Sequence, residues 1–157
     1  AYMAIGFLYL GFASKRDFYR MELFLSLAMT ISFIIFILYP NAQFPRPSVP
    51  GNDVFSWLVN FIYDHDGTNN VFPSIHVCNA IGVHIALINC YKLKNKTLLK
   101  SLSFVAALSI CASTVFIKQH SIIDVVGGVI LATIIYIFIY QTPKSFVFSP
   151  KIDNLEN

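Results

Sequence analysis

The feature that most constrains the fold of this chain is a series of long apolar segments. A helix needs about 20 mainly apolar residues to cross the hydrocarbon core of a bilayer. Four segments approach that length, namely 21–39, 75–91, 98–117 and 122–140, and a shorter fifth, 1–13, is typical of a spanning helix cut at its start. Only 12% of the 157 residues are charged, about half the share in a soluble domain. We therefore predict an all-α, polytopic transmembrane helix bundle, with one domain over residues 1–143 and a short polar cytoplasmic tail over 144–157.

A further apolar segment, 54–63, covers only about half a span. Asn52 and Asp53 are possible N-caps for it, and Trp57 and Tyr63 are typical of side chains at a membrane interface. Two interpretations stay open for this segment. It is either a helix lying along the membrane surface or a buried loop segment.

The distribution of positive charge predicts the orientation in the membrane. If every segment crosses once, one side of the membrane holds the cations Lys15, Arg16, Arg20, Lys92, Lys94, Lys96, Lys100, Lys144 and Lys151. The other side holds the connections 40–74 and 118–121, with only Arg46 and Lys118. The positive-inside rule then places these two connections on the extracytoplasmic face.

The same composition bears on location and partners. A bias toward Ile, Asn, Lys and Phe is typical of AT-rich bacterial genomes, so we expect an integral protein of a bacterial plasma membrane, surrounded by membrane lipids. The basic residues form no continuous stripe, so we expect no nucleic-acid partner. The sequence carries no signal for an oligomeric state.

Polar residues that the membrane pattern does not explain gather in or beside the two extracytoplasmic connections. They are Arg46, Ser74, His76, Lys118, His120 and Asp124. Ionisable groups at or inside the hydrophobic zone are costly and usually mark a functional site. Cations, two histidines and one carboxylate at one membrane face predict a site for an anion, with acid–base or nucleophilic chemistry.

The spacing of these residues suggests how they act. His120 and Asp124 are four residues apart, so they share one face if the last helix begins near His120. Asp124 would then hold one imidazole nitrogen and leave the other free as nucleophile or base. His76 would lie opposite, placed to protonate a leaving oxygen. Arg46, Lys118, the hydroxyls of Ser74 and Ser113, and free N–H groups at the start of the 75–91 segment would bind the anionic oxygens.

Other polar and small residues have simpler interpretations. We interpret Asp64, His65 and Asp66 as a solvated turn, and not as a metal site, because Gly67, Thr68 and two Asn follow them. We interpret His84 as a hydrogen-bonded packing group. Gly127 and Gly128 predict close helix packing.

Three motifs resemble those of the type 2 phosphatidic acid phosphatase superfamily. They are Arg46-Pro47, then Pro73-Ser74-Ile75-His76, then Ser113 followed by His120 and Asp124 at the spacing of the family's third signature. The resemblance implies a six-helix bundle, of which a chain lacking its first helix would show five segments. It also implies a site with no metal and no cofactor.

The resemblance implies a role for each matching residue. His120 would form the phosphohistidine, Asp124 would orient it, and His76 would be the general acid. Arg46, Ser74 and Ser113 would bind phosphate. The chain departs from the signatures at three positions, with Tyr39 for a Lys, Ile75 for a Gly and Thr114 for an Arg. Lys118, one turn further on, would replace one missing cation.

In these departures the chain resembles the branch of the superfamily that contains inositol phosphorylceramide synthase and sphingomyelin synthase, which transfer a lipid phosphate group to an alcohol. From the resemblance to the superfamily as a whole we expect a membrane phosphatase that hydrolyses a lipid phosphate or a polyprenyl diphosphate. The first alternative is a lipid phosphotransferase that moves a phosphate head group to a lipid alcohol. The second is a non-catalytic membrane scaffold.

Overall fold

A computed structural model describes residues 2–42 and 46–142, and the described residues form an all-α bundle. Its helices are α1 (Tyr2–Ala13), α2 (Lys15–Leu38), α3 (Val54–His65), α4 (Ile75–Asn89), α5 (Thr97–Phe116) and α6 (Ile122–Tyr136). A short 3-10 helix, η1 (Tyr91–Leu93), follows α4, and a π-helical turn, η2 (Ile137–Gln141), extends α6. No strand occurs within these residues, so the predicted all-α class is confirmed.

The predicted apolar segments all fall on helices. Three helical stretches are long and apolar enough to cross a membrane, namely α2, α5 and α6 continued through η2, while α1 and α4 are apolar but shorter. Helix α2 begins at Lys15, six residues before the predicted start, because Ser14 caps it there with a side chain that accepts a hydrogen bond from the Asp17 amide. The predicted tail at 144–157 lies outside the described residues.

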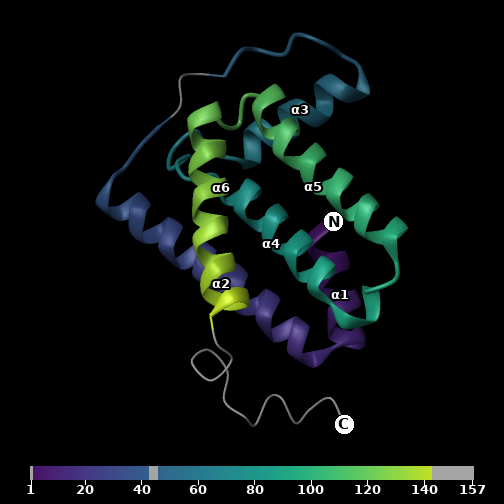
Figure 1. Ribbon diagram of the computed structural model, residues 1–157. Helices are drawn as coiled ribbons and strands as arrows, with labels where there is room; N and C mark the ends of the chain where they lie inside the picture. Colours follow the sequence, from purple (N-terminus) through teal and green to yellow (C-terminus); the bar gives the residue numbers. More distant parts are fainter. Residues whose placement is uncertain (1, 43–45, 143–157) are drawn as a thin grey trace.

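Helix α4 is the centre of the bundle, and it packs against α1, α2, α5 and α6 (Figure 1). Its side chains form one apolar core with residues from α2 and α6. The fully or almost fully buried members include Met21, Phe24, Ala28, Cys78, Val83, Ala86, Ala132 and Ile135. The large apolar side chains exposed on the outer faces of α5 and α6 are those expected to face lipid.

Two consecutive glycines let α6 approach the start of α4 closely. A Cβ at Gly128 would lie 2.7 Å from the carbonyl oxygen of Ser74, and a Cβ at Gly127 would collide with the ring of Phe72. Ordinary side chains at these positions would hold the two helices apart. The predicted close packing at Gly127 and Gly128 is therefore confirmed.

The long connection between α2 and α4 contains the short helix α3. Asp53 is its N-cap and accepts hydrogen bonds from the amides of Phe55 and Ser56, as predicted. No residue of α3 is buried, so the buried-loop interpretation is wrong and the segment is helical. Figure 1 shows α3 at the same end of the bundle as the turn that joins α5 to α6.

Candidate active site

The segment that leads into α4 is held by one amide side chain, that of Asn41. The side-chain Oδ1 accepts hydrogen bonds from the amides of Val71 (2.8 Å) and Phe72 (2.9 Å). The main-chain carbonyl of Asn41 accepts a further hydrogen bond from the amide of Asn70. Its Nδ2 donates to the carbonyl of Tyr39 at the end of α2 (2.9 Å). Asn41 thus fixes the segment 70–72 against the end of α2, and the first turn of α4 follows directly.

His76 lies in that first turn. Ser74 caps the helix, because its Oγ accepts from the Val77 amide at 3.4 Å. The Ser74 amide in turn donates to the carbonyl of Asp124 in α6, at 3.0 Å. A backbone hydrogen bond therefore sets the start of α4, and with it His76, against the start of α6.

His120 lies in the tight turn between α5 and α6. The amide of Lys118 donates to the carbonyl of Val115, and the amides of Gln119 and His120 donate to the carbonyl of Thr114. Together with a left-handed φ of 58° at Lys118, the first two bonds form a Schellman motif, in which that position is usually Gly. The motif closes α5 and directs His120 back over the start of α4.

The two histidines meet at this end of the bundle. Their ring centroids are 5.6 Å apart and the ring planes are inclined by 66°. His120 is buried, whereas the side chain of His76 is half exposed. At this distance and inclination the two rings are in edge-to-face contact, so both imidazoles can reach one small group placed beside them.

Asp124 lies beside His120, but its carboxylate is occupied by the start of α6. The helix begins at Ile122, two residues after His120, with Ser121 as N-cap. The Ser121 amide donates to Asp124 Oδ2 at 2.6 Å, and the same oxygen lies 3.9 Å from His120 Nδ1. At that distance the two groups interact electrostatically, but they are too far apart for the predicted hydrogen bond. No described group hydrogen-bonds the buried Nδ1.

The surroundings of His120 favour its neutral form. Burial lowers the pKa of its imidazole below the ordinary 6.5, and the neighbouring His76 lowers it further. The carboxylates of Asp124 and Asp66 and the backbone of Val71 oppose this shift without reversing it. A neutral imidazole has an unshared electron pair, so this environment suits a nucleophile.

A cavity of about 90 Å³ lies between the two histidines and the connection that follows α3. This volume has room for a few water molecules or one phosphoryl group. The residues that line it are Phe36, Asp66, Gly67, Asn69, Asn70, Val71, Ile75, His76, Gln119 and His120. Most of its polar groups therefore come from the 66–71 segment and the α5–α6 turn.

None of the four side chains predicted to bind phosphate lines this cavity. Ser74 is fully buried as the α4 cap, and the exposed Ser113 donates its hydroxyl to the Ile110 carbonyl of its own helix. Lys118 is exposed at the turn. Arg46 is buried, with its side chain 6% exposed. Their assignment to phosphate binding stays a prediction.

Arg46 binds a residue that the sequence interpretation did not place in the site, Asp66. Its Nη2 lies 3.0 Å from Asp66 Oδ2, and its Nη1 donates to the Asp66 carbonyl. Gln119 Nε2 donates to the same Oδ2 at 2.8 Å. The other carboxylate oxygen, Oδ1, lies 4.0 Å from His76 Nε2.

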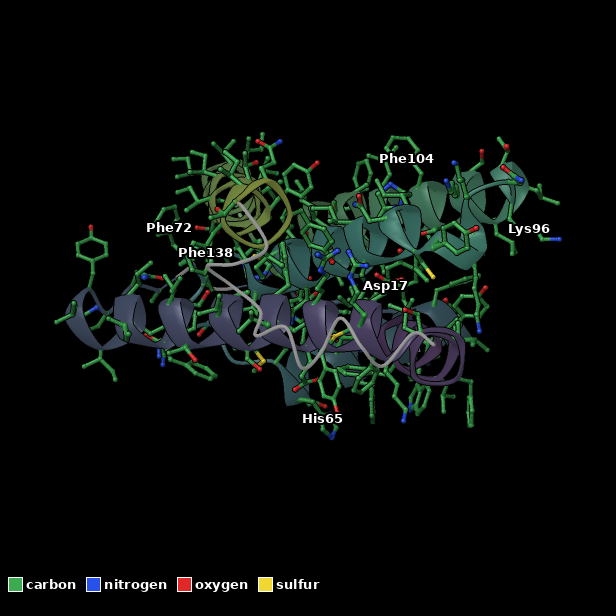
Figure 2. The ribbon with its side chains drawn as sticks, turned by 60° about the horizontal axis from the view of Figure 1, so that its bottom comes forward. Asp17, His65, Phe72, Lys96, Phe104 and Phe138 are labelled. Carbon is green, nitrogen blue, oxygen red and sulfur yellow. The ribbon has the colours of Figure 1, made fainter. Side chains whose placement is uncertain are left out.

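The interpretation of Asp64, His65 and Asp66 as one solvated turn is therefore wrong for Asp66, and Asp64 and His65 are solvent-exposed but belong to the last turn of α3. Asp64 is exposed, and Figure 2 shows His65 at the margin of the molecule, pointing away from the helices. Asp66, at the C-cap of α3, turns toward the cavity instead. A carboxylate at a helix C-terminus is unfavourable unless a cation compensates it. Arg46, the one cation in the connection 40–74, was the available signal.

His84 lies away from this site, inside the bundle. Its Nδ1 lies 2.9 Å from the Ser103 hydroxyl, which also contacts the Tyr2 hydroxyl at 2.7 Å, and its ring packs on Phe104. The prediction that His84 is a hydrogen-bonded packing group is confirmed.

The fold and the site define a class: a helical membrane protein with two histidines and a carboxylate at one end of the bundle. The family model of the PAP2 superfamily matches residues 21–147, which include every predicted site residue. The chain belongs to that superfamily. Neither the curated proteins nor the solved structures gave a match. Membership supports an activity of the phosphatase or phosphotransferase type on lipid phosphates.

Proposed function

We propose that this protein is a membrane-embedded phosphatase that hydrolyses a lipid phosphate monoester or a polyprenyl diphosphate at the extracytoplasmic face. The reaction passes through a phosphohistidine on His120. The observation that carries the proposal is that His76 and His120 line one cavity with their rings in edge-to-face contact, the centroids 5.6 Å apart. His76 comes from the first turn of α4 and His120 from the α5–α6 turn, and the fold brings them together.

A second cavity supports a lipid as the substrate. It measures about 190 Å³ and lies among α1, α4 and α5, where Tyr2, Met3, Ala80 and Ile110 contribute a mainly apolar lining. His76 lines this cavity as well as the polar one. A phosphorylated lipid fits this arrangement, with the phosphoryl group beside the histidines and the chain among apolar helices.

The first step transfers the phosphoryl group to the protein. His120 attacks phosphorus through Nε2, since Nδ1 lies toward Asp124, and the P–N bond forms as the bond to the leaving oxygen breaks. His76, in its protonated form, gives its proton to that oxygen. The carboxylate of Asp124 stabilises the positive charge that develops on His120.

The second step restores the protein. Neutral His76 takes a proton from a water molecule as the water oxygen attacks phosphorus, and the P–N bond breaks. Inorganic phosphate leaves, His120 is neutral again, and His76 has regained its proton. If a lipid alcohol replaces water in this step, the same residues perform a transfer.

Phosphate release from purified protein tests the proposal. We expect the parent protein to release phosphate from vesicles containing phosphatidate or a polyprenyl diphosphate, and His120→Ala to abolish the release. His65→Ala is the matched control, because His65 is exposed and points away from the bundle. It should retain the parent rate.

Two further results decide between the alternatives. Addition of diacylglycerol or ceramide that diverts the label from inorganic phosphate into a lipid product identifies a phosphotransferase. A parent protein that turns over none of these substrates, or a His120→Ala variant as active as the parent, refutes the proposed mechanism.

A further inference from the structure

The cavity contains a carboxylate, Asp66, for which the two-step mechanism above has no use. A negative charge beside a phosphate site repels the substrate unless cations compensate it. Asp66 has three donor side chains around it, and one of them is His76, the proposed general acid. Its side chain is 35% exposed, so it lies in the wall of the cavity and not in the core.

The two oxygens of this carboxylate face different partners. Oδ2 is the anchor, since it accepts from Arg46 at 3.0 Å and from Gln119 at 2.8 Å. These bonds join the end of α3 to the turn before α6. Oδ1 is left facing His76 Nε2, at 4.0 Å.

The anchor fixes where Oδ1 points. Arg46 also donates to the carbonyl of Gly67 (3.2 Å), and its guanidinium stacks on the ring of Tyr63, 4.9 Å from the centroid. These contacts, with the Arg46 side chain only 6% exposed, leave the Asp66 side chain little freedom to turn away from His76. The contact of 4.0 Å is electrostatic and too long for a hydrogen bond, and an anchored carboxylate there favours one orientation of the imidazole ring.

We propose that Asp66 is a positioning residue for His76, holding its imidazole in the orientation from which it can give its proton to the leaving oxygen. This inference rests on the proposed function and adds a residue to it. In this proposal His120 and Asp124 form the nucleophilic half of the site, and His76 and Asp66 form the acid half. Each imidazole has a carboxylate oxygen within 4.0 Å of one ring nitrogen.

The role predicts a dependence on the leaving group. Protonation by a general acid matters most when the leaving oxygen is strongly basic, and it matters little when the leaving group is stable as an anion. Benzyl phosphate and 4-nitrophenyl phosphate are monoesters of similar size, and benzyl alcohol is by far the poorer leaving group. Loss of Asp66 should therefore slow the first ester much more than the second.

The experiment compares the two esters in the parent protein and in Asp66→Asn. A general acid contributes about 100- to 10,000-fold, so we expect Asp66→Asn to lower kcat/KM for benzyl phosphate by about tenfold to 100-fold. For 4-nitrophenyl phosphate we expect less than about threefold. Asp64→Asn is the matched control, because it removes the same charge from an exposed side chain two residues away. It should change neither ester.

Two further variants keep the test decisive. Asp66→Glu retains the charge that Arg46 binds and displaces the oxygen that faces His76, so it should show the same selective loss if Asp66→Asn does not fold. In a His76→Ala background, Asp66→Asn should have no further effect on the ratio of the two rates, because its action passes through His76.

The possible failures are distinguishable. An equal loss for both esters, or a change of ratio that persists in the His76→Ala background, overturns the role of Asp66 and leaves the proposed function intact. A rise in the rate for both esters also overturns it, since Asp66 would then be an internal competitor for phosphate. If the parent protein releases phosphate from no substrate, the proposed function itself fails.

Discussion

Replacing Gly128 with alanine tests the link between helix packing and the site. A Cβ at this position would lie 2.7 Å from the Ser74 carbonyl oxygen, whereas ordinary contact begins at 3.4 Å, so the two helices must separate by about 0.7 Å. The contacted atom is backbone and cannot move aside as a flexible side chain would. Because Ser74 and Asp124 share a backbone hydrogen bond across this contact, the separation moves His76 relative to His120.

The size of the effect follows from two opposing contributions. Overpacking costs about 1–3 kcal/mol, and alanine in a helix returns about 0.5–1 kcal/mol relative to glycine. The difference is a net loss of up to about 2.5 kcal/mol in the free energy of unfolding, with a central value of about 1 kcal/mol. A misplacement of about 1 Å lowers rates by about 100-fold, so we expect kcat to fall on the order of tenfold.

Thermal unfolding in detergent, followed by circular dichroism, and phosphate release measure the two effects. Gly11→Ala in α1 is the control, because a Cβ there meets only the ring of Phe18 at 3.7 Å, an ordinary contact. It should unfold at the parent temperature or above and retain activity. If Gly128→Ala matches the parent in both measurements, the close approach of α6 to α4 does not set the site.

Two other predictions concern the α5–α6 turn. Burial lowers the pKa of His120 below 6.5, so the nucleophile is lost to protonation only below that pH. In a plot of kcat/KM against pH, the fall in activity on the acidic side should therefore lie below pH 6.5. A fall that begins above pH 6.5 contradicts the assignment of His120 as the nucleophile. Lys118 has φ 58°, which costs a non-glycine residue about 1–2 kcal/mol. Lys118→Gly should therefore unfold at a higher temperature than Lys118→Ala, which loses the same side chain but keeps the strain, and equal melting temperatures would contradict this reasoning.

The helices were predictable because lipid imposes a simple pattern on sequence. Each apolar segment became a helix, and Asp53 became the cap of α3. The start of α2 at Lys15 was missed because its first turns carry charge, which interrupts the apolar pattern without ending the hydrogen-bonded helix. The length of an apolar segment indicates which residues contact lipid, and the helix that contains the segment can extend beyond it.

The site was predictable where its chemistry is local in sequence. His120 and Asp124 are close because they are only four positions apart in the sequence, and His76 is placed at the start of a helix with a serine cap. Asp66 and Asn41 depend on contacts between distant segments. Polar residues beside glycine and asparagine are typical of solvated turns. No local pattern around Asp66 shows that this segment folds back onto Arg46 instead of facing solvent.

Asn41 binds its neighbours through their main-chain groups alone, at Tyr39, Asn70, Val71 and Phe72. Hydrogen bonds to main-chain groups do not depend on which side chains those residues carry. Val71 can therefore exchange its side chain, which lines the cavity, without loss of the hydrogen bond that its amide donates to Asn41. Asn70 is more restricted, because its left-handed φ of 58° suits few residues other than Asn, Asp and Gly. At position 71 the path of the loop depends on the amide, and the lining of the cavity depends on the side chain.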